Sequence, residues 1–128
     1  MRKWPFAEVK RLLFVGAHPD DLETIVGGTI YQLTQRGVVV VEVLCTDGNI
    51  GTHEVDKYTR RSLASARRKE TRAAAKFLGV SEVVFLGHDD GELEPSLALR
   101  ALRSRRRRAS LLRQANAKPP KAMLTGGG

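Results

Sequence analysis

Residues 12–36 read LLFVGAHPDDLETIVGGTIYQLTQR, and this stretch decides the fold. Its first four residues, Leu12–Val15, form an apolar run that is typical of a short buried strand. Gly16 and Pro19 interrupt the run, and the segment Leu22–Arg36 that follows is typical of a helix. The stretch therefore predicts a strand that turns directly into a helix, with a polar cluster at the turn between them.

Two further strands and one further helix continue the alternation. Val38–Cys45 and Val83–Leu86 are apolar or β-branched and predict strands, and Ser62–Leu78 predicts a helix. The order strand, helix, strand, helix, strand favours parallel strands with right-handed crossovers. We therefore expect residues 1–96 to form an α/β domain, Rossmann-like and three-layered, with a mainly parallel sheet that is unfinished at one edge. Such a sheet predicts marginal stability or association, for example as a homo-oligomer.

The polar cluster has the residue types of a metal site. His18 and Asp21 are three residues apart, so both side chains can point at one centre if Pro19 takes the first helical position. An imidazole with a carboxylate suits zinc and, less specifically, iron or manganese. Asp20 is then placed to act as a general base for a metal-bound water, and Glu23 to orient His18 or a backbone group.

A second interpretation of the same spacing stays open. Carboxylates are favoured in the first turn of any helix because they face the positive end of its dipole. Asp20, Asp21 and Glu23 would then only stabilise the helix start, with His18 as a turn residue.

Four segments, in order, resemble one family. Residues 17–30, AHPDDLETIVGGTI, resemble the signature of the zinc-dependent sugar de-N-acetylases that include the PIG-L and LmbE proteins. Residues 44–52, LCTDGNIGT, resemble a strand-end loop of that family, most closely in its diacetylchitobiose deacetylase branch. Residues 67–80, RRKETRAAAKFLGV, and 85–93, FLGHDDGEL, also match in family order. The resemblance covers about residues 10–95 of the chain.

The resemblance implies a chemistry for the cluster. It makes His18 and Asp21 zinc ligands and Asp20 the general base. The expected reaction is hydrolysis of the acetamide of an N-acetylglucosamine-type sugar or its conjugate, with release of acetate. Arg67 or Arg68 corresponds to a position that faces the substrate in the family, although an arginine on so charged a helix is more often a solvated residue or a partner of Glu70 on the same helix.

Other candidate residues follow the second and third strands, at the edge that His18 shares. Asp47 and Asn49 are candidate substrate-binding residues, and the alternative for Asp47 is a turn before Gly48. Asp89 and Asp90 follow the third strand, where a turn role is at least as favourable as a substrate contact.

The family's third zinc ligand is a histidine in a later His-rich motif that this sequence lacks. His53 is a poor substitute and His88 fits a surface loop. Two ligands rarely hold a catalytic zinc tightly. We therefore expect that the chain is a fragment, that a partner completes the site, or that activity is weak.

Charge divides the chain near residue 95. All 14 acidic residues precede Pro95, where they accompany 13 of the 22 basic residues, so this part carries −1 and the rest carries +9. Residues 97–128 predict a basic helix followed by a disordered or frame-altered end. Such a tail could attach a non-catalytic α/β fragment to nucleic acid or another polyanion, although it has no aromatic residue for base stacking. No apolar run is long enough for a membrane span, and the amino terminus lacks the apolar core of a signal peptide, so we expect a cytoplasmic protein.

Overall fold

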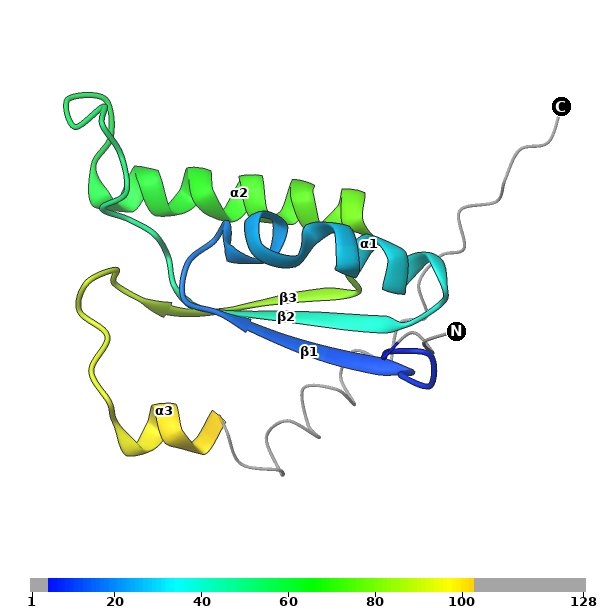
Figure 1. Ribbon diagram of the computed structural model, residues 1–128. Coiled ribbons are helices and arrows are strands. Elements are labelled where there is room, and N and C mark those ends of the chain that lie inside the picture. The colour runs from blue at the N-terminus through cyan, green and yellow to red at the C-terminus, as the bar shows by residue number, and fades with distance from the viewer. Residues whose placement is uncertain (1–4, 103–128) are drawn as a thin grey trace, which may run out of the picture.

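The structure is a computed structural model that describes residues 5–102. It contains three strands, β1 (Arg11–Gly16), β2 (Val39–Thr46) and β3 (Glu82–His88), which lie in the order β1-β2-β3 with both pairs parallel (Figure 1). The helical elements are η1 (Leu22–Val26), α1 (Gly27–Gln35), α2 (Arg60–Leu78) and α3 (Leu97–Leu102). The predicted α/β fold with a parallel sheet is confirmed. The predictions for residues 103–128 lie outside the described residues.

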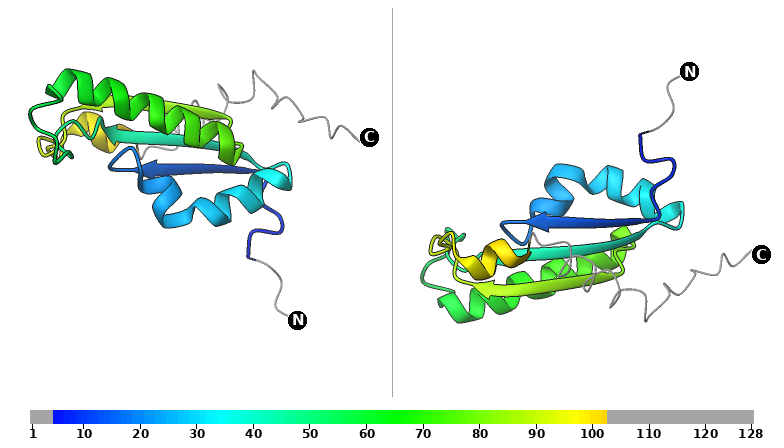
Figure 2. Two further views of the ribbon diagram at one scale, coloured as in Figure 1. Left: turned by 90° about the horizontal axis from the view of Figure 1, so that it is seen from above. Right: turned by 90° about the horizontal axis from the view of Figure 1, so that it is seen from below.

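Two helices cover one face of the sheet, and a short third helix lies at one end of the other face. Helices α1 and α2 lie side by side on one face, and α3 lies beneath the other face near the carboxyl ends of the strands (Figures 1 and 2). Because all three strands are parallel, the loops that leave them meet at one edge of the sheet. This edge carries the polar residues that the sequence singles out. Within residues 5–102 no helix has the length and apolarity that crossing a bilayer requires.

The predicted helix over Leu22–Arg36 is confirmed, but it is not a regular α-helix throughout. The segment begins as a π-helical turn, η1, and becomes α-helical at Gly27, directly after Val26, which has φ −133° and ψ 10°. The glycine pair at 27–28 weakens helical preference by roughly 1 kcal/mol per residue, and the change of helix type falls at this pair. Pro19 lies in a turn before η1 rather than in the first helical position.

Helix α2 begins two residues earlier than predicted. Thr59 caps it, because its hydroxyl accepts a hydrogen bond from the Ser62 backbone N–H while the Ser62 hydroxyl accepts one from the Thr59 backbone N–H. This reciprocal pair is a capping box with serine in place of the usual glutamate. The helix ends at Gly79, which has φ +77° and lies so close to Thr34 that a Cβ atom there would be 2.9 Å from the threonine side chain.

The main core lies between the sheet and the two long helices. Its buried members are aliphatic side chains from both layers: Leu22, Ile30, Leu33, Val38, Val40 and Leu78. Burying a side chain of this size stabilises the fold by about 1.5–3 kcal/mol. The position of Leu22 in this core fixes the start of η1 against the sheet, and with it the polar turn that precedes η1.

One residue of the helix-covered face is a carboxylic acid. Glu42 lies in the middle of β2, paired with Phe14 of β1 and Val83 of β3, and only 1% of it is exposed. Its Oε1 atom has no hydrogen-bond partner among the described residues. Burial, followed by the nearby charges of Glu23 and Asp21, raises the pKa of Glu42 from 4.5 to about 7. The folded protein therefore favours the neutral acid.

This burial makes stability depend on pH. Because the folded-state pKa lies above the unfolded value, Glu42 lowers stability progressively as pH rises from about 4.5 to 7. A shift of this size corresponds to roughly 3 kcal/mol. We predict that Glu42→Met stabilises the protein at pH 8 by more than at pH 4, with the difference measured by urea unfolding at both values. Glu94→Met, at an exposed position, is the control, and a parallel pH dependence in both variants would contradict this role.

Candidate functional site

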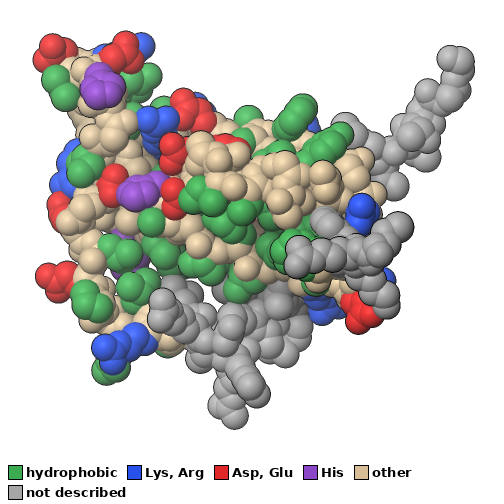
Figure 3. Space-filling view, viewed as in Figure 1, with side chains coloured by type: hydrophobic (Ala, Val, Ile, Leu, Met, Phe, Trp, Pro, Cys, Tyr) green, Lys and Arg blue, Asp and Glu red, His purple; other side chains and the backbone are tan. Residues whose placement is uncertain are grey.

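The polar residues of the carboxyl edge come from three loops that are tied together. They lie in the turn between β1 and η1, in the loop after β2, and in the loop after β3. Thr46, at the end of β2, donates to the Ala17 carbonyl from both its backbone N–H and its hydroxyl, at 2.9 and 2.8 Å. Figure 3 shows histidine, acidic and basic side chains gathered at this edge of the molecule.

Asp21 organises the first loop. Its Oδ2 atom accepts hydrogen bonds from the backbone N–H groups of Ala17 and His18, at 2.7 and 2.9 Å. Its Oδ1 atom lies 3.8 Å from Nδ1 of His18. That separation is too long for a hydrogen bond. It is comparable to the separation of two atoms that share one cation, since zinc bonds to nitrogen and oxygen are about 2.1 Å each.

The other nitrogen of His18 contacts Asp90, and the sequence did not predict this contact. His18 Nε2 lies 3.1 Å from Oδ1 of Asp90, which follows β3. The only signal in the sequence was the position of Asp90 after the third strand. A histidine that binds a metal through one nitrogen usually donates a hydrogen bond to a carboxylate from the other. Asp90 occupies the place that the sequence analysis gave to Glu23, whose carboxylate makes no hydrogen bond or ion pair within residues 5–102.

His18 and Asp21 are the two side chains here that could hold a metal together. Within residues 5–102 there is no group of three or more histidine, cysteine or acidic side chains placed to hold one ion. Neither His53 nor His88 therefore joins the pair. The donor set of one imidazole nitrogen and one carboxylate oxygen fits zinc but leaves its other coordination positions to be filled by water or by other groups.

A small pocket of about 110 Å³ adjoins His18. Its walls are formed by His18, Pro19, Asp20, Gly48, Gly51, Arg67 and Asp90. The Asp20 side chain is exposed and makes no hydrogen bond within the described part of the chain. Arg67 donates a hydrogen bond to the Gly51 carbonyl at 2.8 Å and another to Glu70 at 3.0 Å. Asp20 and Arg67 thus lie beside His18, as the predicted roles require, and those roles remain predictions.

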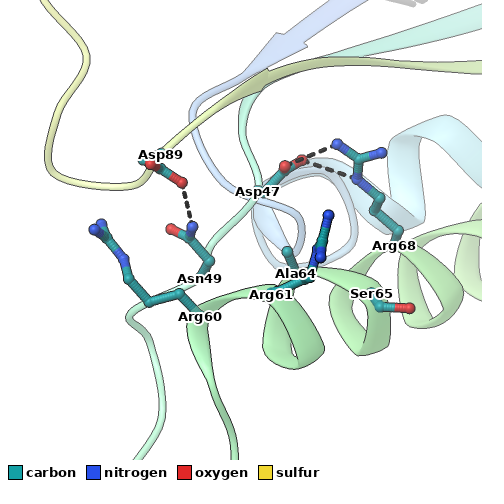
Figure 4. Close-up of a pocket in the computed structure, with 8 residues that line it drawn as sticks. All are labelled: Asp47, Asn49, Arg60, Arg61, Ala64, Ser65, Arg68 and Asp89. Carbon is teal, nitrogen blue, oxygen red and sulfur yellow. Dashed lines mark hydrogen bonds and ion pairs between the residues drawn. The ribbon is translucent and has the colours of Figure 1, made fainter.

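Arg68 lies on the other side of the loop that follows β2. Its guanidinium group donates two hydrogen bonds to the Asp47 carboxylate, from Nε at 3.1 Å and from Nη2 at 2.8 Å (Figure 4). These hydrogen bonds raise the pKa of Arg68 above its ordinary value. The two residues line a second pocket, of about 500 Å³, together with Asn49 and Asp89. Arg68 and Asp47 were each predicted to bind substrate, whereas in the structure they bind each other.

Asn49 links the second and third loops. Its amide oxygen accepts a hydrogen bond from the Asp90 backbone N–H at 3.0 Å, and its amide nitrogen donates to the Asp89 carboxylate. Only 6% of Asn49 is exposed. The predicted contact with substrate remains untested, whereas the link to Asp90 is part of the fold.

Comparison with known proteins identifies a family and several deacetylase relatives. Residues 13–124 match the family model described as PIG-L: GlcNAc-PI de-N-acetylase. Diacetylchitobiose deacetylase from Thermococcus kodakarensis is 40% identical over 89 residues, which cover 70% of this chain and 33% of the relative. A Mycobacterium bovis deacetylase of 1D-myo-inositol 2-acetamido-2-deoxy-alpha-D-glucopyranoside is 37% identical over 107 residues, covering 79% of this chain and 35% of the relative.

A solved structure has the same arrangement of strands and helices. N,N'-diacetylchitobiose deacetylase from Pyrococcus horikoshii superposes with a TM-score of 0.72 at 40% identity, over 75% of this chain and 36% of that one. The chain thus spans about a third of the length of each of these relatives. On the family match over residues 13–124, this chain belongs to the PIG-L family of de-N-acetylases.

Proposed function

We propose that the chain contributes the metal-binding and proton-transfer groups of a hydrolase that removes the acetyl group from an N-acetylglucosamine-type sugar or its conjugate. The observation that carries the proposal is the pairing of His18 with Asp21 on one side and with Asp90 on the other. The family and the deacetylase relatives supply the reaction class.

The residues present fit a zinc ion. Nδ1 of His18 and Oδ1 of Asp21 are the proposed ligands, since Oδ2 of Asp21 is already engaged by two backbone N–H groups. Asp90 would hold the opposite side of the imidazole ring and so fix its orientation. When bound, zinc would polarise the acetamide carbonyl and acidify a bound water.

The proton transfers are assigned to Asp20. Its carboxylate has no hydrogen-bond partner within residues 5–102 and lines the small pocket with His18, so it is free to accept the proton of the attacking water. The water oxygen bonds to the acetamide carbon, the carbon–nitrogen bond breaks, and Asp20 returns the proton to the leaving amine. Arg67, on the same pocket, would bind an oxygen of the sugar.

Zinc binding gives the first test. We predict that His18→Ala and Asp21→Ala each lower the affinity of the chain for zinc by at least about tenfold, because each removes one of two proposed ligands. Competition with a chromophoric chelator measures this affinity. His53→Ala is the matched control and should leave the affinity unchanged. Equal affinity in all four proteins would rule out the proposed zinc site.

Acetate release gives the second test, with N,N'-diacetylchitobiose as the probe. We predict that Asp20→Asn lowers kcat by about 10²–10⁴-fold, the usual contribution of general acid–base catalysis, while zinc affinity is retained. The exposed Asp56 provides the control variant Asp56→Asn, which should keep wild-type kinetics. An Asp20→Asn protein with an unchanged kcat would remove Asp20 from the mechanism.

A further inference from the structure

We infer that Arg68 is a positioning residue that, through Asp47 and Asn49, holds Asp90 against His18. The kinetic part of this inference rests on the proposed function, and its structural part does not. This role differs from the substrate contact that the sequence suggested. It also gives the consecutive residues Arg67 and Arg68 different roles, because their side chains contact different groups.

The first step is the hold of Arg68 on Asp47. Two parallel hydrogen bonds from one guanidinium group fix the orientation of a carboxylate, whereas a single hydrogen bond leaves it free to rotate. The guanidinium carbon of Arg68 also lies 5.2 Å from the centre of the Phe85 ring in β3. This cation–π contact limits the movement of the guanidinium group. Asp47 is only 7% exposed, so its carboxylate depends on Arg68 for charge compensation.

The second step runs from Asp47 to the third loop. The Asp47 backbone N–H donates to the His88 carbonyl at 3.0 Å, just past an irregularity in the β2–β3 pairing between Leu44 and Thr46. Because the regular β2–β3 pairing ends at this irregularity, the contacts of Asp47 fix the position of the end of β2 relative to the end of β3. Gly48 then passes so close to Pro19 that a Cβ atom would lie 2.8 Å from the proline ring. The loop has little freedom to compensate for a displaced Asp47.

The third step runs from Asn49 to His18. Asn49 accepts from the Asp90 backbone N–H, and the Asp90 carboxylate lies 3.1 Å from His18 Nε2. The series of contacts therefore begins on α2, passes through the ends of β2 and β3, and reaches the loop after β1. Within residues 5–102, the only hydrogen bond that joins Asp90 directly to α2 is a long one of 3.5 Å, from Nη2 of Arg60 to the Asp90 carbonyl oxygen.

Arg67 and Arg68 diverge because consecutive residues on a helix point in directions about 100° apart. Arg67 faces the pocket that contains His18 and Asp20, whereas Arg68 faces the pocket that contains Asn49 and Asp89 (Figure 4). A substrate held beside His18 would therefore meet Arg67. Arg68 would act on it only through Asp90.

Amide hydrogen exchange tests the structural part on the full chain. Arg68→Lys keeps the charge but loses the two-pronged hydrogen bond. We predict that exchange of the Asp47 and Asp90 amides accelerates by at least about tenfold, while the Val41 and Val43 amides in the centre of β2 change by less than about twofold. Uniform acceleration of all four amides would mean that Arg68 only stabilises the fold and would overturn the inference, and so would no change at Asp90.

Arg72→Lys is the matched control. Arg72 lies on the same helix and 5.0 Å from the same Phe85 ring, but among residues 5–102 no hydrogen bond joins it to a carboxylate. The control should leave the Asp47 and Asp90 amides unchanged. Asp47→Asn should reproduce the Arg68→Lys pattern, and the double variant should be no worse than either single variant, because both break one interaction. Additive effects would contradict a shared path.

Kinetics supply the second readout. A positioning role predicts that Arg68→Lys lowers kcat by about 10-fold to 100-fold and changes KM by less than about twofold, since misplaced groups slow the chemical step. A raised KM with an unchanged kcat would instead identify Arg68 as a substrate contact and overturn the inference. If wild-type protein releases no acetate from any amino sugar while the exchange pattern holds, the proposed function fails and the positioning role stands.

Discussion

The site depends on one carboxylate that accepts two backbone hydrogen bonds. By binding the N–H groups of Ala17 and His18 through one oxygen, Asp21 folds the loop back on itself and leaves its other oxygen directed at the His18 ring. These hydrogen bonds lie within the loop and add to the packing of Leu22, which fixes the start of η1. This explains how a metal-type geometry can form although Pro19 does not begin a helix and the helix itself starts as a π-helical turn.

The carboxyl edge of the sheet combines buried, hydrogen-bonded side chains with exposed ones. Thr46 and Asn49 are buried and their side chains are hydrogen-bonded. His18 and Asp20 are exposed beside a small pocket. Glu42 is a buried acid on the helix-covered face of the sheet, and among residues 5–102 its Oε1 atom has no hydrogen-bond partner, so its burial lowers stability as pH rises toward 7. Local rules for a stable fold are broken most often near functional sites, and the charge of Asp21 contributes to the raised pKa of Glu42. The fold thus tolerates an unfavourably buried carboxylic acid near the residues that would bind metal.

Local patterns in the sequence were sufficient for the strands, and their alternation with helices predicted the parallel order. For His18 and Asp21, spacing left two interpretations open, and the resemblance to the de-N-acetylase family favoured a shared metal. The contact between His18 and Asp90 joins residues 72 positions apart, so no local pattern contains it. The paired hydrogen bonds from Arg68 to Asp47 could not be predicted from a local pattern either, since the two residues are 21 positions apart. Both residues were recognised as candidates for substrate binding but not as partners of each other. Apolar spacing predicted the helix over Leu22–Arg36 but not its π-helical first turn, because that spacing indicates which face of a helix is buried and not the type of helix.

The most direct measurement of the central claim is ¹⁵N NMR of the His18 imidazole during zinc titration. We predict that the Nδ1 resonance moves to a metal-bound position while Nε2 keeps its proton and its contact with Asp90. Zinc binding through Nε2, or a titration in which neither His18 nitrogen responds, would contradict it.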